Sequence, residues 1–220
     1  MKVEYHSTLE PRNYYHLYNK AVSGREMFVV DSDCVRFLEK FNSYFEPYLN
    51  LVAYCLIPNH FHFLVQVKEL SDLTTESLKK EKTKTSIKFL SGEGSYHDFL
   101  VDQFRRYMSS HSLYINKKHK LQGPLFLKKM KKVKVKSENK LFDLLCYIHH
   151  NPIHHGIVYE YDKWIYSSYN DYIQNPTKGD YAPILRELGN DDIKVGLAES
   201  LRLHKEYKDN FLEYRDDKDS

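Results

Sequence analysis

Residues 57–65 read IPNHFHFLV, an apolar, strand-like run in which His60 and His62 stand one residue apart behind a Pro-Asn step. In a β-strand, residues i and i+2 point to the same face, roughly 6–7 Å apart along the chain. The two imidazoles therefore project together, while Phe61 and Phe63 face the opposite layer. Two neutral imidazoles on one strand can converge on a single cation. The spacing by itself also fits two polar residues on a solvated strand face.

The rest of the chain predicts a mixture of strands and helices. Residues with strand-forming composition and period two occupy 14–22, 49–59, 60–69 and 130–137. Helical periodicity is found at 31–46, 96–119 and 138–151, with Asp31 and Ser137 as expected N-caps. The strand at 130–137 alternates lysine with valine and is expected to carry a basic outer face. This order favours an α+β fold, an antiparallel sheet with helices packed on it.

Three further segments differ from this pattern. Residues 71–95 are polar and rich in Ser, Thr, Lys and Gly, so we expect a flexible or weakly helical insertion. Residues 164–173, WIYSSYNDYI, read as a strand or a loop. From Pro183 onward the sequence predicts a helical, largely solvated tail.

Charge is distributed unevenly along the chain. The net charge is only +3, yet Lys117–Lys136 carries nine lysines and no acid. A local basic block in a nearly neutral chain indicates a polyanion bound at one place. The candidate phosphate contacts are Arg105, Arg106, Lys128, Lys129, Lys131 and Lys132. A solvated helix and strand face is the alternative for any one of them.

The cysteines and the N-terminus indicate the compartment. Cys34, Cys55 and Cys146 are too far apart in sequence to suggest a disulfide framework or a zinc knuckle. The first residues lack the apolar core of a signal peptide, and no run approaches membrane-spanning length. We therefore expect a cytoplasmic protein without a membrane partner.

A second cluster of polar residues lies in LLCYIHHNPIHHGIV, residues 144–158. Tyr147, His150, Asn151 and His154 share one helix face if the helix continues past Pro152. The alternative is an amphipathic helix with an apolar core face and a surface tyrosine. Two histidines off the Tyr147 face are expected at the surface, namely His149 and His155.

Both clusters together predict phosphoryl transfer on a nucleic acid. A tyrosine hydroxyl has a pKa near 10 and needs activation to attack phosphorus. A metal that polarises the phosphate and a group that accepts the phenolic proton supply it. His150 and His154 are the candidate proton acceptors. Tyr107 and Tyr114 are alternative nucleophiles, although neither is followed by Asn-Pro at this spacing.

The order of the motifs resembles that of the REP-associated tyrosine transposases, which are single-tyrosine HUH transposases of insertion sequences. The similar segments lie within residues 12–172 and are YYHLYNKAV, AYCLIPNHFHFLVQV, GPLF, YIHHNPIHHGIV and WIYSSY. The resemblance implies a ferredoxin-like α+β domain with the histidine pair on a central strand. It implies that His60, His62 and Asn151 bind Mg²⁺ or Mn²⁺, and that Tyr147 attacks single-stranded DNA to form a 5′-phosphotyrosine.

The resemblance also implies an organisation and a partner. Residues 1–175 would form the catalytic domain. The insertion at 71–95 and the helical extension at 176–220 are expected from this chain's own sequence, and the resemblance implies nothing about either. The substrate would be single-stranded or hairpin-containing DNA, cut and rejoined by a monomer or a homodimer. A hydrolytic metal-dependent nuclease is one alternative, and a non-catalytic DNA-binding module is the other.

Overall fold

The computed structural model describes residues 4–72 and 83–211. The chain divides into two compact units, Met1–Leu51 with Leu56–Val135 and Val52–Cys55 with Lys136–Ser220. This division differs from the expected boundary near residue 175, so a catalytic domain spanning 1–175 stays a prediction. No helix in the described part of the chain is long and apolar enough to cross a membrane.

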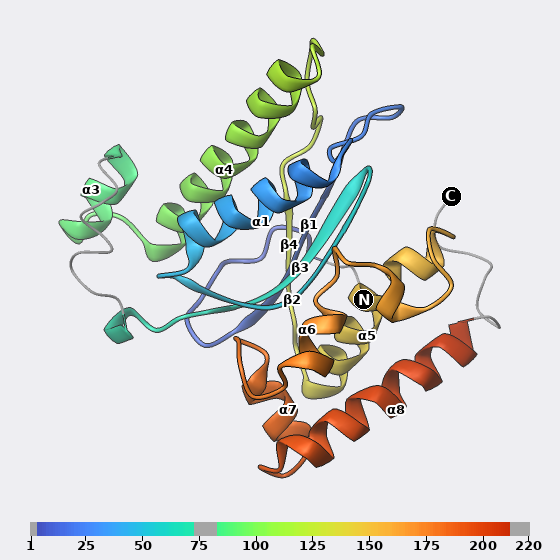
Figure 1. Ribbon diagram of the computed structural model, residues 1–220. Helices are drawn as coiled ribbons and strands as arrows, with labels where there is room; N and C mark the ends of the chain where they lie inside the picture. The colour runs from blue at the N-terminus through green and yellow to red at the C-terminus, as the bar shows by residue number, and fades with distance from the viewer. Residues whose placement is uncertain (1–3, 73–82, 212–220) are drawn as a thin grey trace. The chain divides into compact units, whose positions relative to one another are not determined.

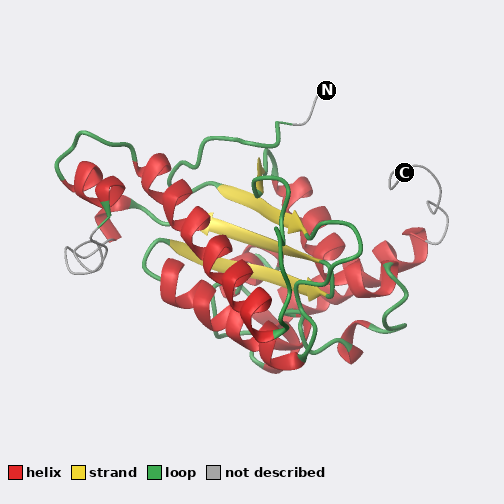
Figure 2. Ribbon diagram, turned by 90° about the horizontal axis from the view of Figure 1, so that it is seen from above, coloured by secondary structure: helices red, strands yellow, loops and turns green. Residues whose placement is uncertain are grey.

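The strands and helices between Tyr14 and Lys134 follow the order of a ferredoxin-like fold. The elements in chain order are β1 (Tyr14–Lys20), α1 (Asp31–Phe45), β2 (Leu49–Ile57), β3 (His60–Val67), α3 (Lys84–Leu90), α4 (Tyr96–Lys118) and β4 (Lys131–Lys134). The sheet order is β2-β3-β1-β4, and arrows of neighbouring strands point in opposite directions (Figure 2). The predicted α+β class is confirmed, and β3 is a central strand.

The two faces of the sheet differ in chemistry. Phe61 and Phe63 are fully buried and pack against Phe37 of α1, with ring centroids 5.1 and 5.8 Å apart. α1 and α4 lie side by side over this aromatic face (Figure 1). The other face, here called the histidine face, carries a group of stacked or adjoining rings from β1 and β3: His16, Tyr18, His60 and His62.

A buried carboxylate joins the two helices of the aromatic face. Asp31 is the first residue of α1 and not its N-cap. Instead, Asp33 Oδ2 accepts hydrogen bonds from the amides of Val29 and Val30 at 3.0 and 3.1 Å. The same carboxylate pairs with Lys118 at 2.7 Å and His119 at 2.9 Å. These donors hold the pKa of Asp33 at about 2, although burial acts in the opposite direction.

The lysines of the edge strand β4 are not all solvated. Tyr18 pairs with Lys131 in the register of β1 and β4, and Leu17 pairs with Lys132. Directly paired residues share a face, so Lys131 belongs to the histidine face, where its Nζ lies 5.1 Å from the Tyr18 ring. Lys132 faces the α4 side and is only 8% exposed. The expectation of a basic outer face is therefore wrong for Lys132.

The second unit contains four α-helices among its described residues, α5 (Glu138–His154), α6 (Tyr169–Gln174), α7 (Ala182–Leu188) and α8 (Ile193–Phe211). Ser137 caps α5 as expected, and the helix continues past Pro152. The strand-or-loop prediction for 164–173 is wrong where α6 begins. The tail is helical as predicted, but it is not merely solvated because Ile184 and Leu185 are buried.

The insertion predicted at 71–95 lies partly outside the described residues. Within the described part it contains α3, whose N-cap Thr83 accepts a hydrogen bond from the Ser86 amide at 3.0 Å. Phe89 of α3 packs on Phe99 of α4 with centroids 5.5 Å apart. This part of the insertion is therefore a helix attached to α4.

A chain of buried hydrogen bonds links α5 to α8. His204 Nδ1 donates to the Ser200 carbonyl at 2.6 Å, so its Nε2 accepts from His149 Nδ1 at 2.8 Å. His149 Nε2 then accepts from the Ser168 hydroxyl at 2.8 Å. The expectation that His149 is a surface residue is wrong, because α8 covers that side of α5; His155 is exposed as predicted.

Candidate functional site

The histidine pair lies at the start of β3 on the histidine face. His60 and His62 are only 7% and 5% exposed. Their ring centroids are 5.1 Å apart and the rings are almost perpendicular, at 88°. Two solvated polar residues would not be buried in this way. The burial excludes the interpretation as two polar residues on a solvated face, and a shared ligand for the two rings stays a prediction.

Neighbouring side chains engage the Nδ1 atom of both rings. His60 Nδ1 donates to Asn59 Oδ1 at 2.7 Å, because an amide oxygen can only accept. His62 Nδ1 lies 2.8 Å from Nε2 of His16. A histidine that gives one ring nitrogen to a neighbour can offer only the other to a metal, and the bond fixes the orientation of the ring. Nε2 of both histidines would be the metal ligand.

His16 is a site residue that the sequence analysis missed. It lies on β1, two residues before Tyr18, and its ring stacks on Tyr18 and His62 with centroids 4.5 and 5.0 Å apart. Burial lowers the pKa of His16 to about 3, so the ring is neutral at pH 7. His16 and His62 are diagonal neighbours across two strands, and only the register between those strands could have revealed that they touch.

Tyr147 and Asn151 lie on α5 of the second unit, one helical turn apart as predicted. Tyr147 is half-buried and Asn151 is 1% exposed. The Asn151 Nδ2 group donates to the Tyr147 carbonyl at 3.5 Å. If Asn151 bound a metal, Oδ1 would be its ligand atom. The roles of both residues stay predictions.

The two candidate proton acceptors differ in their surroundings. His150 is 3% exposed, and its Nδ1 lies 3.0 Å from the Tyr161 hydroxyl. That hydroxyl donates to the His204 carbonyl at 2.9 Å, so His150 Nδ1 is the donor to it. Burial lowers the pKa of His150 to about 4. His154 is partly exposed at the last turn of α5.

The alternative nucleophiles have structural roles. Tyr107 is 1% exposed, donates to the Phe37 carbonyl at 3.0 Å, and has its pKa raised by burial. The Tyr114 hydroxyl accepts from Lys118 at 2.9 Å, and Arg36 lies 4.0 Å above its ring. Tyr107 is too buried to reach a phosphate.

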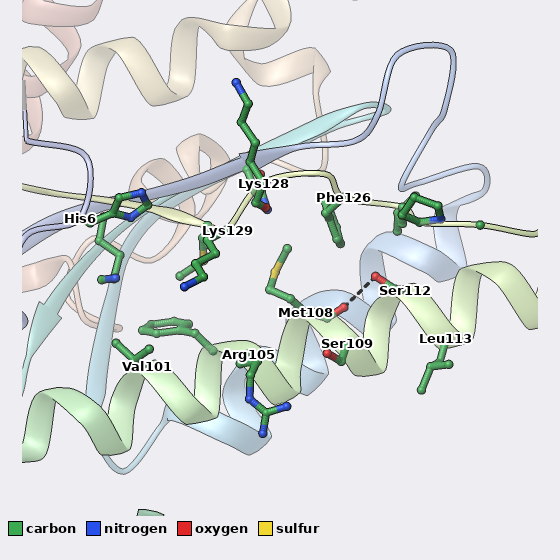
Figure 3. Close-up of a pocket in the computed structure, with 17 residues that line it drawn as sticks. His6, Val101, Arg105, Met108, Ser109, Ser112, Leu113, Phe126, Lys128 and Lys129 are labelled. Carbon is green, nitrogen blue, oxygen red and sulfur yellow. Dashed lines mark hydrogen bonds between the residues drawn. The ribbon is translucent and has the colours of Figure 1, made fainter. Parts of the chain in front are cut away.

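Four of the six candidate phosphate contacts line one cavity of about 580 Å³ between α4 and residues 123–132 (Figure 3). They are Arg105, Lys128, Lys129 and Lys132. Arg105 pairs with Asp102 at 2.8 Å and points away from the cavity. Arg106 bonds Gln103 at 3.2 Å, and Lys131 lies on the histidine face.

The ligand set for a metal is incomplete if only ionisable side chains are counted. Within residues 4–72 and 83–211, no group of three or more His, Cys, Asp or Glu residues is placed to hold a metal ion. Two imidazoles with fixed rings fit two positions of a divalent cation. Further ligands would have to be amide oxygens, water or the substrate phosphate.

Comparisons with known proteins support the fold. No protein-family model and no curated protein sequence matches the chain. The structure is similar to that of a REP-associated tyrosine transposase bound to a REP hairpin, with a TM-score of 0.54 and 11% sequence identity. The similarity covers 81% of this chain and 90% of the other. The resemblance seen in the sequence is thus confirmed at the level of the fold, which is that of a REP-associated tyrosine transposase.

Proposed function

We propose that the chain is a metal-dependent DNA strand transferase that cuts and rejoins single-stranded, hairpin-containing DNA through a tyrosine. The observation that carries the proposal is the buried His60–His62 pair, oriented through Nδ1 on the central strand of a transposase-like fold. A protein that only bound DNA would not need two buried imidazoles oriented in this way.

In the proposed reaction Tyr147 Oη forms a bond to the phosphorus of the scissile phosphate, and the bond from phosphorus to the 3′-oxygen of the preceding nucleotide breaks. The products are a 5′-phosphotyrosine and a 3′-hydroxyl, which takes up a proton. His154 is the preferred acceptor of the phenolic proton, since burial lowers the pKa of His150 to about 4 and makes it a weak base. The link from tyrosine through phosphate to the 5′-oxygen is itself a phosphodiester. A 3′-hydroxyl can therefore displace the tyrosine and reverse the step.

The proposed metal ligands are Nε2 of His60, Nε2 of His62 and Oδ1 of Asn151. A divalent cation held there would supply Lewis acidity at a non-bridging phosphate oxygen. Imidazole nitrogen suits the later first-row ions, while amide and phosphate oxygens suit Mg²⁺ and Mn²⁺. Mn²⁺ accepts both donor types more readily than Mg²⁺, so we propose that Mn²⁺ binds the isolated protein more tightly.

The experiment uses labelled single-stranded oligonucleotides tiled across the DNA that flanks the gene, incubated with Mg²⁺ or Mn²⁺ and separated on a denaturing gel. We expect a protein-linked label with wild-type protein and none with Tyr147→Phe, which should still bind the DNA. Tyr114→Phe is the matched control and should keep the adduct. A Tyr147→Phe variant that forms the adduct at the wild-type rate would overturn the assignment.

The same gel separates the alternative functions. Released fragments without an adduct would indicate a hydrolytic nuclease that uses the histidine pair with water as nucleophile. DNA that is bound but never cut, under both metals and across all tiles, would indicate the non-catalytic binding module.

A further inference from the structure

The cavity beside α4 has walls of two kinds. Residues 123–126, the GPLF motif, form one wall with Phe126 and Leu125, and α4 forms the other with Phe104 and Met108. In Figure 3, Met108 points from α4 toward the 123–132 segment, while Phe126 and Lys129 point from that segment toward α4. The cavity therefore has apolar walls and a basic rim, which consists of Lys128, Lys129 and Lys132.

The segment that forms this wall is fixed to the end of β1. The Val22 amide donates to the Leu125 carbonyl at 2.9 Å, and Asn19 Nδ2 donates to the Lys128 carbonyl at 3.1 Å. Gly123 has a φ of +86°, a conformation that favours glycine and turns the chain into the segment. The cavity is therefore held by the fold and does not depend on a ligand for its shape.

Lys132 places a positive charge in this cavity, on a residue that is largely buried. Residues 5–7 cover the outer edge of β4, where the Lys132 amide donates to the Tyr5 carbonyl at 2.8 Å and the Ser7 amide donates to the Lys132 carbonyl at 3.0 Å. Lys132 as a whole residue is 8% exposed. Within the described part of the chain, its ammonium has neither an ion pair nor a side-chain hydrogen bond, and no acidic residue lines the cavity.

A largely buried lysine without a counter-charge is costly, because its ammonium loses part of its hydration and gains no partner. Burial and the nearby Lys129 both lower the pKa of Lys132. An anion that entered the cavity would relieve this cost and would be held by two ammonium groups. The arrangement therefore favours a ligand that combines a compact anion with a flat apolar group.

We propose that this cavity binds one unpaired nucleotide of the DNA strand, with its phosphate on Lys132 and Lys129 and its base between Phe126 and Met108. A cavity of about 580 Å³ is of the size that holds a small organic ligand. Lys128 and Lys129 of the rim are exposed and suit neighbouring phosphates of the same strand. This argues for a nucleotide within a polymer.

The inference rests on the proposed function for the identity of the polymer, but the site is separate from the chemistry. Lys132 faces the α4 side of the sheet, whereas His60 and His62 lie on the histidine face. Binding at the cavity should therefore not require the metal, and it can be measured without cleavage.

The test measures the dissociation constant of a fluorescent single-stranded oligonucleotide in EDTA at several salt concentrations. Lys132→Met should raise the dissociation constant roughly ten-fold or more, because it removes a charge-assisted hydrogen bond to the phosphate. It should also reduce, by about 0.7, the slope of the logarithm of the binding constant against the logarithm of the salt concentration, since one phosphate is no longer neutralised. The melting temperature should not fall, because within the described residues Lys132 has no ion pair that the substitution could remove. Lys134→Met is the matched control, since Lys134 lies on the same strand and face but pairs with Glu10 at 2.6 Å.

A second variant tests the base. Ser109 lies on the cavity side of α4 and is exposed, so Ser109→Trp would fill the cavity without removing a charge. 2-Aminopurine, a fluorescent base, is placed at successive unpaired positions. At one position its fluorescence should be quenched by wild-type protein and not by Ser109→Trp. Equal losses of affinity for Lys132→Met and Lys134→Met, an unchanged salt slope, or equal sensitivity of fully paired DNA would overturn the proposal. So would dAMP that binds as tightly as the oligonucleotide.

These outcomes are distinguishable from failure of the proposed function. If no tyrosine adduct forms but Lys132→Met weakens strand binding as expected, the cavity stands and the transferase chemistry fails. If the adduct forms and Lys132→Met binds like wild type, the chemistry stands and the cavity proposal fails.

Discussion

His62 is held by a second histidine, and this interaction decides which of its nitrogens is presented. For Nε2 of His62 to bind a cation, the ring must carry its proton on Nδ1 and donate it to Nε2 of His16, 2.8 Å away. Burial keeps His16 neutral at pH 7, which leaves that nitrogen able to accept. His16 is therefore a positioning residue in the proposed metal site.

Replacing His16 with phenylalanine should weaken metal binding at the proposed site, because it keeps an aromatic ring at this position but removes the ring nitrogens. The ring stacking on Tyr18 and His62 is kept, while the hydrogen bond to His62 is removed. We expect Mn²⁺ affinity, measured by calorimetry, to fall about 10- to 100-fold, the usual cost of removing a hydrogen bond that orients a metal-binding histidine.

Tyr18→Phe is the control for this experiment, because it leaves the His16–His62 bond in place and should bind Mn²⁺ normally. Unchanged Mn²⁺ affinity in His16→Phe would show that His16 does not position His62.

The elements of the first unit follow from the local sequence, whereas their mutual register does not. Period-two and helical patterns were sufficient to predict β1, β3, α1 and α4, and the i,i+4 spacing of Tyr147 and Asn151 is visible in the letters. His16 beside His62, and Lys132 on the α4 side of β4, depend on how β1 pairs with β3 and β4. That pairing is a long-range property that no single segment carries.

The Asp33 carboxylate should make the α1–α4 pair sensitive to acid. Its pKa is about 2 in the folded protein, below the ordinary 3.8, so folding favours the charged form. The stabilisation is present above pH 3.8 and is lost as the pH falls toward 2. The difference corresponds to about 2 kcal/mol, at about 1.4 kcal/mol for each pKa unit.

Urea unfolding of wild type and Asp33→Asn between pH 2 and pH 6 measures this contribution. We expect Asp33→Asn to be less stable by about 2 kcal/mol at pH 6 and the two curves to converge near pH 2. A constant difference across this range would mean that the charge of Asp33 is not responsible.

At the scale of the whole molecule, the second unit differs from the first in that two of its helices, α5 and α8, are linked to each other by histidines buried in the neutral form. Burial lowers the pKa of His149 well below its ordinary value and that of His204 to about 4. The hydrogen bond between α5 and α8 could not be predicted from the sequence, because it joins residues 55 positions apart. The spacing within α5 alone therefore predicts a surface position for His149, and this prediction is wrong.

The sign of the resulting pH dependence is opposite to that of a histidine in an ion pair. The unfolded chain binds protons near pH 6.5 and the folded chain does not, so stability is full above pH 6.5 and falls as the pH drops toward 4. We expect the melting temperature of wild type to decrease over this range, and that of His204→Gln to decrease less.

His111→Gln provides the comparison in the first unit, since burial lowers the pKa of His111 to about 4 as well. Hydrogen exchange would separate the contributions of His204 and His111. His204→Gln should alter the pH dependence of amide protection in α5 and α8, and His111→Gln should alter it in α4. A pH dependence in α5 and α8 that is the same in wild type and His204→Gln would contradict the account.

The measurement that tests the central claim most directly is mass spectrometry of the protein after incubation with a cleavable single-stranded oligonucleotide and Mn²⁺. Digestion with nuclease and protease should leave a nucleotide on one peptide. We predict that the peptide contains residues 141–154 and that fragmentation places the added mass on Tyr147. An adduct on any other residue, or cleaved DNA with no modified peptide at all, would contradict the account.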